Sequence, residues 1–297
     1  MVDLLKAVND ADLSPETKAN YRTMCNSMCS KAGENITINT ILSKPAAYLP
    51  LIKKWFPKIT SYKVHLSIIL GLFRYNKALQ TKYAKAREKW AEAFKLADEA
   101  VTARYETNKP TERQQEGYVE YAKIIEARDA LPKGAINRVL LGMYTYIRPM
   151  RCEYARTAIY KSVVPTDAEP NYILLKTGNM IIRQFKTKKH HDSYDIELPE
   201  PLLEDIRRSL ELRPRDWLFV NRAGEPYTHN MYTAWSMRAF KSIFGKPLTV
   251  SLIRHSFINT LDMNTLSIQE KKEIALSMGH TIGTQDSYRL IFTNKLE

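Results

Sequence analysis

An arginine, a histidine and a tyrosine follow one another near the C-terminal end of the chain, at spacings that suit chemistry on a phosphodiester. Arg254 is followed by His255, His280 ends a Met-Gly-His tripeptide, and Tyr288 comes eight positions after His280. Arginine offers a fixed fork of donors for two phosphate oxygens. A tyrosine hydroxyl can attack phosphorus and hold it as a covalent ester. The pattern therefore predicts cleavage of a phosphodiester through a phosphotyrosine, a route that needs no nucleotide cofactor.

In order and spacing these residues resemble the C-terminal signature of the tyrosine recombinases, the phage-integrase class. That signature reads arginine-histidine, leucine-glycine-histidine and then a tyrosine about nine positions further on. The resemblance covers residues 111–292 well and residues 1–108 only in general character. It implies DNA cleavage and rejoining through a 3′-phosphotyrosine at Tyr288, in site-specific recombination or integration of viral or mobile DNA. Arg254 and His280 would then contact the phosphate.

The resembled family places another catalytic arginine near the start of its catalytic domain, and two residues here are candidates. Common bacterial members read threonine-glycine-leucine-arginine, which aligns with Thr145 to Arg148. A viral branch reads proline, any residue, arginine, any residue, acid, tyrosine, which aligns with Pro149 to Tyr154. The second alignment matches more positions and places Glu153 where it could orient a guanidinium. It favours Arg151 as the catalytic arginine and leaves Arg148 as a nearby DNA contact, although both alignments stay open.

The proton donor of the resembled family is a lysine on a β-hairpin. Lys186 follows Phe185 at the end of a predicted strand, as it does in the viral branch. Neighbouring positive charges disfavour the charged form of a lysine, which makes it a better acid. Arg183, Lys188 and Lys189 adjoin it, and we expect these three to contact DNA. A run of this kind can also be a solvated turn.

One position departs from the family pattern. Ser251 lies three residues before Arg254, where the family commonly has a histidine. A serine hydroxyl can hydrogen-bond a phosphate oxygen but cannot shuttle a proton near neutral pH. Ser251 is therefore expected to bind DNA, and His280 to cover part of the missing proton transfer. His255 is expected to be structural.

The composition favours a polyanionic partner. The 297 residues carry 45 Lys+Arg against 32 Asp+Glu, a formal charge of +13, and nucleic acid is the commonest partner of such a surplus. A merely basic globular protein would have the same composition. The absence of an eighteen-residue apolar run predicts no membrane association. Three cysteines without a ligand cluster suit an intracellular, reducing setting. The resemblance implies a location with the DNA or in a virion. No metal-ligand spacing or glycine-rich nucleotide motif is present, so neither kind of cofactor is expected.

The first part of the chain predicts a helical domain. Ser14 and Pro15 form a typical helix start, and apolar spacing predicts further helices over 49–55, 62–75 and 85–103. Pro110 follows a break in this pattern. We therefore expect a helical DNA-binding domain over residues 1–108 and a catalytic domain over 109–297. One continuous helical domain with a kink is the alternative.

The second part predicts a mostly helical domain with a small sheet. Helices are expected over 111–131, from 135 into 154, and from 201 onward, with strands over 172–175, 180–185 and 194–198 and a short extended piece over 217–220. The predicted fold class is mainly α with a small antiparallel β-sheet. With the resemblance, this becomes a two-domain DNA clamp whose catalytic domain is like that of a tyrosine recombinase.

Two other functions fit the same residues. A type IB topoisomerase shares this chemistry but rejoins the same strand and works alone, whereas a recombinase assembles, usually as a tetramer, on paired sites of double-stranded DNA. A DNA-binding protein of the same fold without catalysis is the third reading, and the full set of arginine, lysine, histidine and tyrosine argues against it.

Overall fold

The computed structural model describes residues 4–185 and 192–292. The chain divides into two compact units, Met1–Thr107 and Asn108–Glu297. Each unit has its own apolar core. That the first unit binds DNA and the second is catalytic stays a prediction.

The first unit is all helical in its described part. Its helices are α1 (Leu4–Asp10), α2 (Pro15–Ala32), α3 (Ile38–Ser43), α4 (Pro45–Trp55), α5 (Ile59–Tyr75), α6 (Lys77–Lys82) and α7 (Ala84–Glu106). The Ser14 side chain accepts from the backbone N–H of Thr17, so the predicted helix start is confirmed. The apolar helix α5 packs along α7, and the buried Trp90 donates its indole N–H to the Leu42 carbonyl at 3.0 Å.

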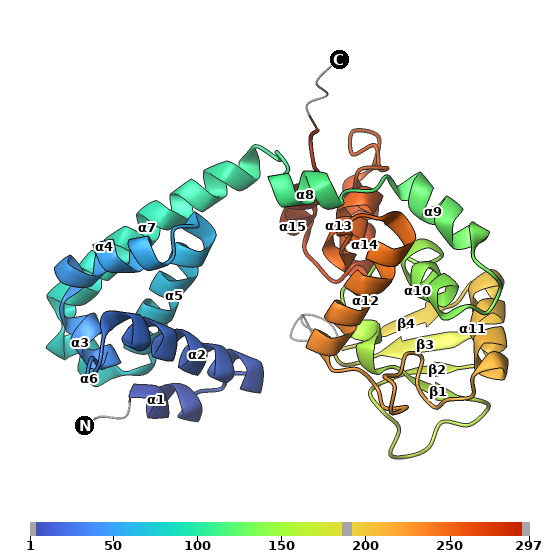
Figure 1. Ribbon diagram of the computed structural model, residues 1–297, viewed down its shortest axis with the longest axis horizontal. Helices are drawn as coiled ribbons and strands as arrows, with labels where there is room; N and C mark the ends of the chain where they lie inside the picture. The colour runs from blue at the N-terminus through green and yellow to red at the C-terminus, as the bar shows by residue number, and fades with distance from the viewer. Residues whose placement is uncertain (1–3, 186–191, 293–297) are drawn as a thin grey trace. The chain divides into compact units, whose positions relative to one another are not determined.

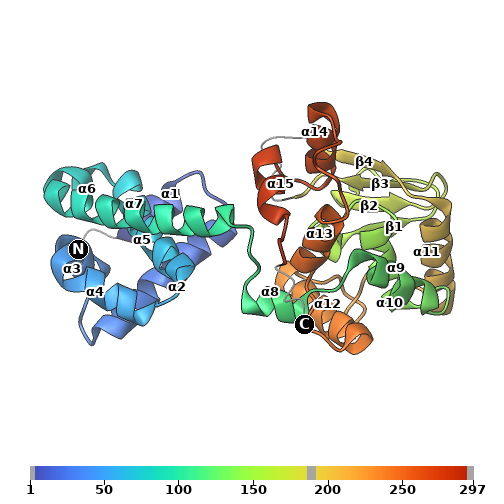
Figure 2. The same ribbon diagram turned by 90° about the horizontal axis from the view of Figure 1, so that it is seen from above.

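The second unit combines helices with a four-stranded sheet. Its elements are α8 (Glu112–Gly117), α9 (Tyr121–Ala130), α10 (Ile136–Thr145), η1 (Glu153–Arg156), β1 (Ala158–Tyr160), β2 (Asn171–Leu174), β3 (Asn179–Ile182), β4 (Tyr194–Glu197), α11 (Glu200–Leu212), α12 (His229–Phe244), α13 (Val250–Ile258), α14 (Ile268–Ser277) and α15 (Ile282–Tyr288). Figures 1 and 2 show α9, α10 and α11 alongside the sheet, and α13, α14 and α15 grouped together. The core joins Ile173 and Met180 of the sheet to Leu140 of α10 and Leu202 of α11.

The sheet is mixed, which corrects the prediction of an antiparallel one. The three predicted strands are present, and β2–β3 and β3–β4 pair antiparallel. The missed strand β1 pairs parallel to β2, with Ile159 opposite Ile173. The segment predicted to be extended, 217–220, lies beside β1, because the Leu218 N–H donates to the Thr157 carbonyl at 2.8 Å. A three-residue strand carries too little alternation to be predicted locally.

Two predicted helices are shorter than expected. The segment 111–131 forms α8 and α9, separated by the extended Tyr118. The helix expected from 135 into 154 ends at Thr145, because Pro149 lacks an N–H and restricts the residue before it. Residues 146–152 are therefore irregular, and this segment carries both candidate arginines.

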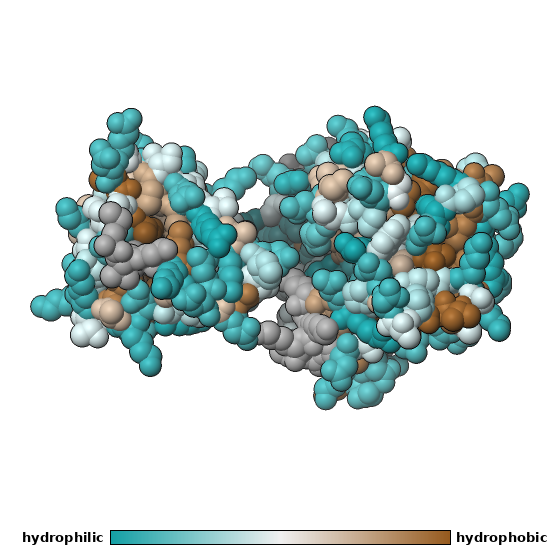
Figure 3. Space-filling view, turned by 90° about the horizontal axis from the view of Figure 1, so that it is seen from below, coloured by the Kyte–Doolittle hydropathy of each residue, from teal (hydrophilic) through white to brown (hydrophobic). Residues whose placement is uncertain are grey.

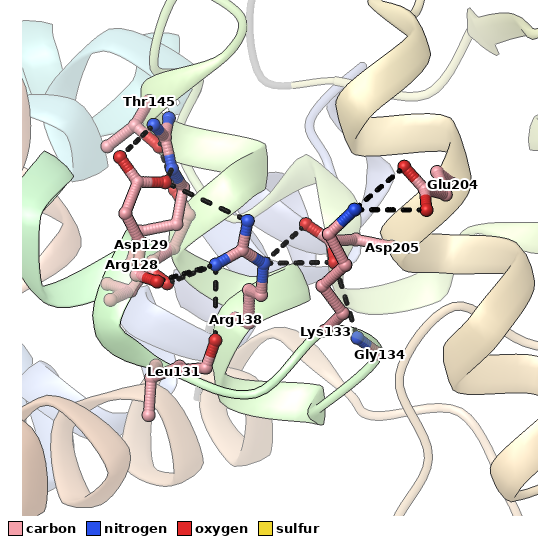
Figure 4. Close-up of polar contacts among 10 residues, drawn as sticks. Arg128, Asp129, Leu131, Lys133, Gly134, Arg138, Thr145, Glu204 and Asp205 are labelled. Carbon is pink, nitrogen blue, oxygen red and sulfur yellow. Dashed lines mark hydrogen bonds and ion pairs between the residues drawn. The ribbon is translucent and has the colours of Figure 1, made fainter.

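A buried ion pair fixes α10 against α11. Arg138 donates through Nε to both carboxylate oxygens of Asp205, at 2.9 and 2.7 Å (Figure 4). Its Nη1 donates to three backbone carbonyls at the end of α9, those of Arg128, Asp129 and Leu131. These contacts satisfy helix-end carbonyls that would otherwise be unpaired. They also anchor the start of the helix that leads into the irregular segment.

The surface is largely hydrophilic on the face shown in Figure 3, with apolar patches on both units. None of the described helices is long and apolar enough to cross a membrane.

Candidate active site

Helix α13 places Arg254 in the interior of the second unit. The helix begins after Thr249, whose side chain accepts from the Leu252 N–H. The Arg254 side chain is 0% exposed, and its Nη1 donates to the carbonyls of Pro149 and Met278, both at 2.8 Å. Its Nε and Nη2 have no hydrogen-bond partner within the described residues, and no carboxylate there pairs with it. A buried guanidinium with free donors is suited to receive an anion.

The last residue of α14 and the three residues after it form a segment, 277–280, on which three arginines converge. Arg148 donates to the Ser277 hydroxyl at 3.1 Å. Arg254 donates to the Met278 carbonyl, and Arg151 donates through Nη1 to the Gly279 carbonyl at 2.6 Å. Gly279 has a φ of 70°, in the left-handed region that favours glycine. Three consecutive residues, 277–279, therefore accept hydrogen bonds from arginines of two distant parts of the chain, residues 146–152 and α13.

The two candidate arginines of the irregular segment differ in their surroundings. Arg151 is half-buried, and its carbonyl accepts from the Tyr144 hydroxyl at 3.0 Å, which ties it to α10. Arg148 is exposed. The expectation that Glu153 orients the Arg151 guanidinium is not met, because no hydrogen bond or ion pair joins these two residues in the described structure. The Gly279 carbonyl holds the guanidinium instead.

His280 lies buried beside the two arginines. It is 9% exposed, and neither ring nitrogen has a hydrogen-bond partner among the described residues. Burial lowers the pKa of His280 to about 3, with the positive charges of Arg254 and Arg151 acting in the same direction. The imidazole is therefore neutral at pH 7, with one N–H available as a donor.

Tyr288, the last residue of α15, brings its ring into the same group. Its ring centroid lies 5.2 Å from that of His280 and 4.9 Å from the central guanidinium carbon of Arg254. The ring of His255 lies 4.7 Å away. Four of the five predicted catalytic residues therefore lie together, namely Arg151, Arg254, His280 and Tyr288.

The fifth, Lys186, lies outside the described residues, as do Lys188 and Lys189. Of the other predicted DNA contacts, Ser251 is exposed on the first turn of α13. Arg183 is also exposed and has its guanidinium 5.6 Å from the ring centre of Tyr172. Neither is joined to the group around Tyr288 by a contact that the structure shows. Their roles stay predictions.

Sequence reasoning missed the contacts that His255 of α13 and the C-cap residue Asn259 make with residues 288–290. His255 was expected to be structural, and its Nδ1 lies 2.5 Å from the Tyr288 carbonyl oxygen. Asn259 donates to the Leu290 carbonyl at 3.0 Å and accepts from the Leu290 N–H at 2.9 Å. Their i, i+4 spacing puts both on one face of the helix. That spacing was the available signal, but it does not say what the face contacts.

No group of three or more His, Cys, Asp or Glu side chains suited to a metal ion occurs in residues 4–185 and 192–292.

Comparison with solved structures reveals the fold. Residues 75–356 of lambda integrase, solved as a dimer bound to a COC′ core site, superpose with a TM-score of 0.60 at 16% identity, covering 99% of this chain and 95% of that chain. This chain has the fold of lambda integrase, a tyrosine recombinase. The same integrase residues bound to DNA give a TM-score of 0.58 at 16% identity, covering 99% and 96%. A lambda integrase tetramer bound to a Holliday junction gives 0.57 at 18% identity, covering 99% and 78%. No family model and no curated protein matches the sequence.

Proposed function

We propose that this protein is a DNA strand transferase that cleaves and rejoins DNA through a 3′-phosphotyrosine at Tyr288. The observation that carries the proposal is the buried Arg254, whose Nε and Nη2 are unpaired beside Tyr288 and His280. Leaving charged donors unpaired in an interior is costly. A phosphate oxygen bound between Arg254 and Arg151 would satisfy these donors and offset that cost.

In the proposed reaction each group has one task. Arg254 and Arg151 stabilise the charge that develops on the non-bridging phosphate oxygens, and neutral His280 adds one N–H donor. The Tyr288 oxygen forms a bond to phosphorus and gives its proton to solvent water, while the bond from phosphorus to the 5′-oxygen breaks. Lys186 is the proposed donor of the proton that this oxygen takes up. Attack by a 5′-hydroxyl on the phosphotyrosine reverses the reaction and rejoins a strand.

The proposed partners are double-stranded DNA and further copies of the chain. The solved structures of lambda integrase with this fold contain a dimer on a core site and a tetramer on a Holliday junction. By analogy with them, we propose that this chain assembles on paired DNA sites for recombination or integration. The positive net charge of +13 supports binding to phosphate backbones. Arg148, Arg183 and Ser251 are proposed as backbone contacts.

The test is incubation with a DNA duplex nicked close to the cleavage site, so that the short 5′-hydroxyl fragment diffuses away and the intermediate accumulates. Denaturing electrophoresis should show a covalent protein–DNA adduct with the wild-type chain and none with Tyr288→Phe, which lacks only the nucleophilic oxygen. DNA affinity should be equal within about threefold, since no phosphate donor is lost. The adduct should also form in a strong chelator, because arginines supply the charge stabilisation.

Other outcomes assign other functions. An adduct that persists in Tyr288→Phe places the nucleophile elsewhere, and cleavage that needs magnesium indicates a nuclease mechanism. Relaxation of supercoiled DNA by a monomer, without exchange between sites, favours a topoisomerase. DNA binding without any adduct leaves a non-catalytic protein of this fold.

A further inference from the structure

Helix α13 and its C-cap residue Asn259 hold the backbone on both sides of Arg289. His255 contacts the Tyr288 carbonyl oxygen through Nδ1 at 2.5 Å. Because a carbonyl only accepts, the His255 Nδ1 carries a proton in this contact. Asn259, one helical turn further on, donates to the Leu290 carbonyl at 3.0 Å and accepts from the Leu290 N–H at 2.9 Å. We call His255 and Asn259 the tyrosine clamp.

The clamp belongs to the helix that carries Arg254, with His255 inside α13 and Asn259 as its C-cap. Arg254 and His255 are adjacent in sequence, and both are buried. Within a nine-residue helix their backbones cannot shift independently. The distance between the Arg254 guanidinium and the Tyr288 ring, 4.9 Å, is therefore set by one rigid element and three hydrogen bonds.

The rest of the packing around Tyr288 is less specific. Its ring packs against a small apolar cluster formed by Ile258, Ile274 and Met278, separate from the main core of the unit. Apolar contacts of this kind are non-directional and do not fix a hydroxyl to a fraction of an ångström. The neighbouring His255 ring, tilted by 36° to the Tyr288 ring, adds a flat surface that limits rotation of the phenol.

We propose that His255 and Asn259 are positioning residues for Tyr288, aligning its oxygen with a phosphate held by Arg254. This inference rests on the proposed function, since it assigns a task within that reaction. Neither residue contributes to phosphate binding in this proposal, and both act through Tyr288. Reactions of bound groups lose rate steeply when the attacking atom is displaced by about 1 Å. The clamp therefore acts on the rate of the chemical step and leaves DNA affinity unchanged.

The matched substitutions follow from the atoms involved. In His255→Asn the side-chain amide nitrogen takes the place of Nδ1 and can still donate to the Tyr288 carbonyl. His255→Leu keeps similar bulk but donates nothing. Asn259→Asp has the same shape, retains the acceptor for the Leu290 N–H and loses the donor to the Leu290 carbonyl. Ser256→Ala is the control, because its buried hydroxyl donates to Val119 and Leu252 and contacts nothing in 288–290.

The experiment measures the single-turnover rate of adduct formation on the nicked duplex, together with DNA affinity and thermal unfolding, for the full-length chain and each variant. His255→Leu and Asn259→Asp should slow the adduct roughly 10- to 100-fold with DNA affinity within about threefold. His255→Asn should return to within about threefold of wild type, and Ser256→Ala should form the adduct at close to the wild-type rate despite lower thermal stability.

The outcomes separate the clamp from the proposed function. If wild type forms the adduct and both His255 variants form it equally fast, the clamp is overturned and the proposed function stands. If wild type forms no adduct, the proposed function fails and the clamp fails with it. Should His255→Leu not fold, Asn259→Asp decides alone, and an undiminished rate in that isosteric variant overturns the proposal.

Discussion

The three arginines that contact segment 277–280 differ in burial and in the groups they contact, and so in what each can contribute to the site. Each donates to a different residue of this segment, yet only Arg254 and Arg151 are docked on carbonyls beside His280. Arg148 reaches the Ser277 hydroxyl from an exposed position. A half-buried guanidinium loses less freedom when it binds a phosphate, because its orientation is already fixed.

Replacing Arg151 with lysine should therefore slow adduct formation by at least about 100-fold, since lysine lacks the planar fork that binds two oxygens. Arg148→Lys should cost less than about tenfold, through weaker DNA binding alone. Single-turnover cleavage at saturating enzyme measures the loss in the chemical step for Arg151→Lys, and a separate measurement of DNA affinity gives the loss in binding for Arg148→Lys. The opposite order would show that the alignment through Arg148 is the correct one.

His280 gives a pH dependence of stability with a defined sign. Burial lowers its pKa to about 3, below the ordinary histidine value near 6.5, so the unfolded chain binds the proton more tightly. The free energy of unfolding is therefore expected to fall as pH drops below about 6.5. Urea unfolding at pH 7.5 and pH 5.0 should show a larger loss for wild type than for His280→Asn. Parallel losses in the two proteins would mean that His280 titrates normally.

At the scale of elements, local pattern predicted most helices and three of the four strands. The start of α2 at Ser14 and Pro15 was readable because caps are local. The strand β1 was not, because its parallel pairing with β2 depends on a partner twelve or more residues away. The structure brings Arg151, Arg254, His280 and Tyr288 together, and their catalytic roles stay a prediction. The carbonyls that orient the arginines could not be predicted, since any residue type can supply one.

Helix α10 leads into the segment that carries Arg151, and a buried ion pair that the sequence pattern did not predict holds this helix in place. Arg138 and Asp205 join α10 to α11 in the interior, while Lys133 and Glu204 pair on the surface next to them (Figure 4). A buried charge left without its partner costs far more than an exposed one. Because Glu204 and Asp205 are neighbours on α11, the two pairs allow an exposed ion pair to be compared with a buried one.

Asp205→Asn should lower the free energy of unfolding by roughly 3 kcal/mol, because Arg138 loses its buried counter-charge. Glu204→Gln should lower it by less than about 1 kcal/mol. Chemical denaturation of the two variants measures the difference directly. Equal, small losses would mean that the backbone carbonyls around Arg138 hold α10 without the carboxylate.

At the scale of the whole molecule, the question is which chain supplies the nucleophile to which phosphate. A protein that assembles on paired sites could deliver Tyr288 to its own arginines or to those of a neighbouring copy. Within one chain the Tyr288 ring lies 4.9 Å from the Arg254 guanidinium. His255 of α13 and its C-cap residue Asn259 are hydrogen-bonded to Tyr288 and Leu290. These contacts favour attack on a phosphate bound by the same chain.

Mixing two inactive variants tests this arrangement. Tyr288→Phe keeps the arginines but has no nucleophile, and Arg254→Lys keeps the nucleophile but lacks the fork that activates the phosphate. If each chain attacks its own phosphate, no mixture of the two contains a complete site, and the adduct stays at the level of the single variants. If tyrosines are exchanged between copies, mixed assemblies contain complete sites and a substantial fraction of the wild-type adduct returns. We expect no recovery at any mixing ratio, with DNA affinity of both variants checked so that each occupies the duplex.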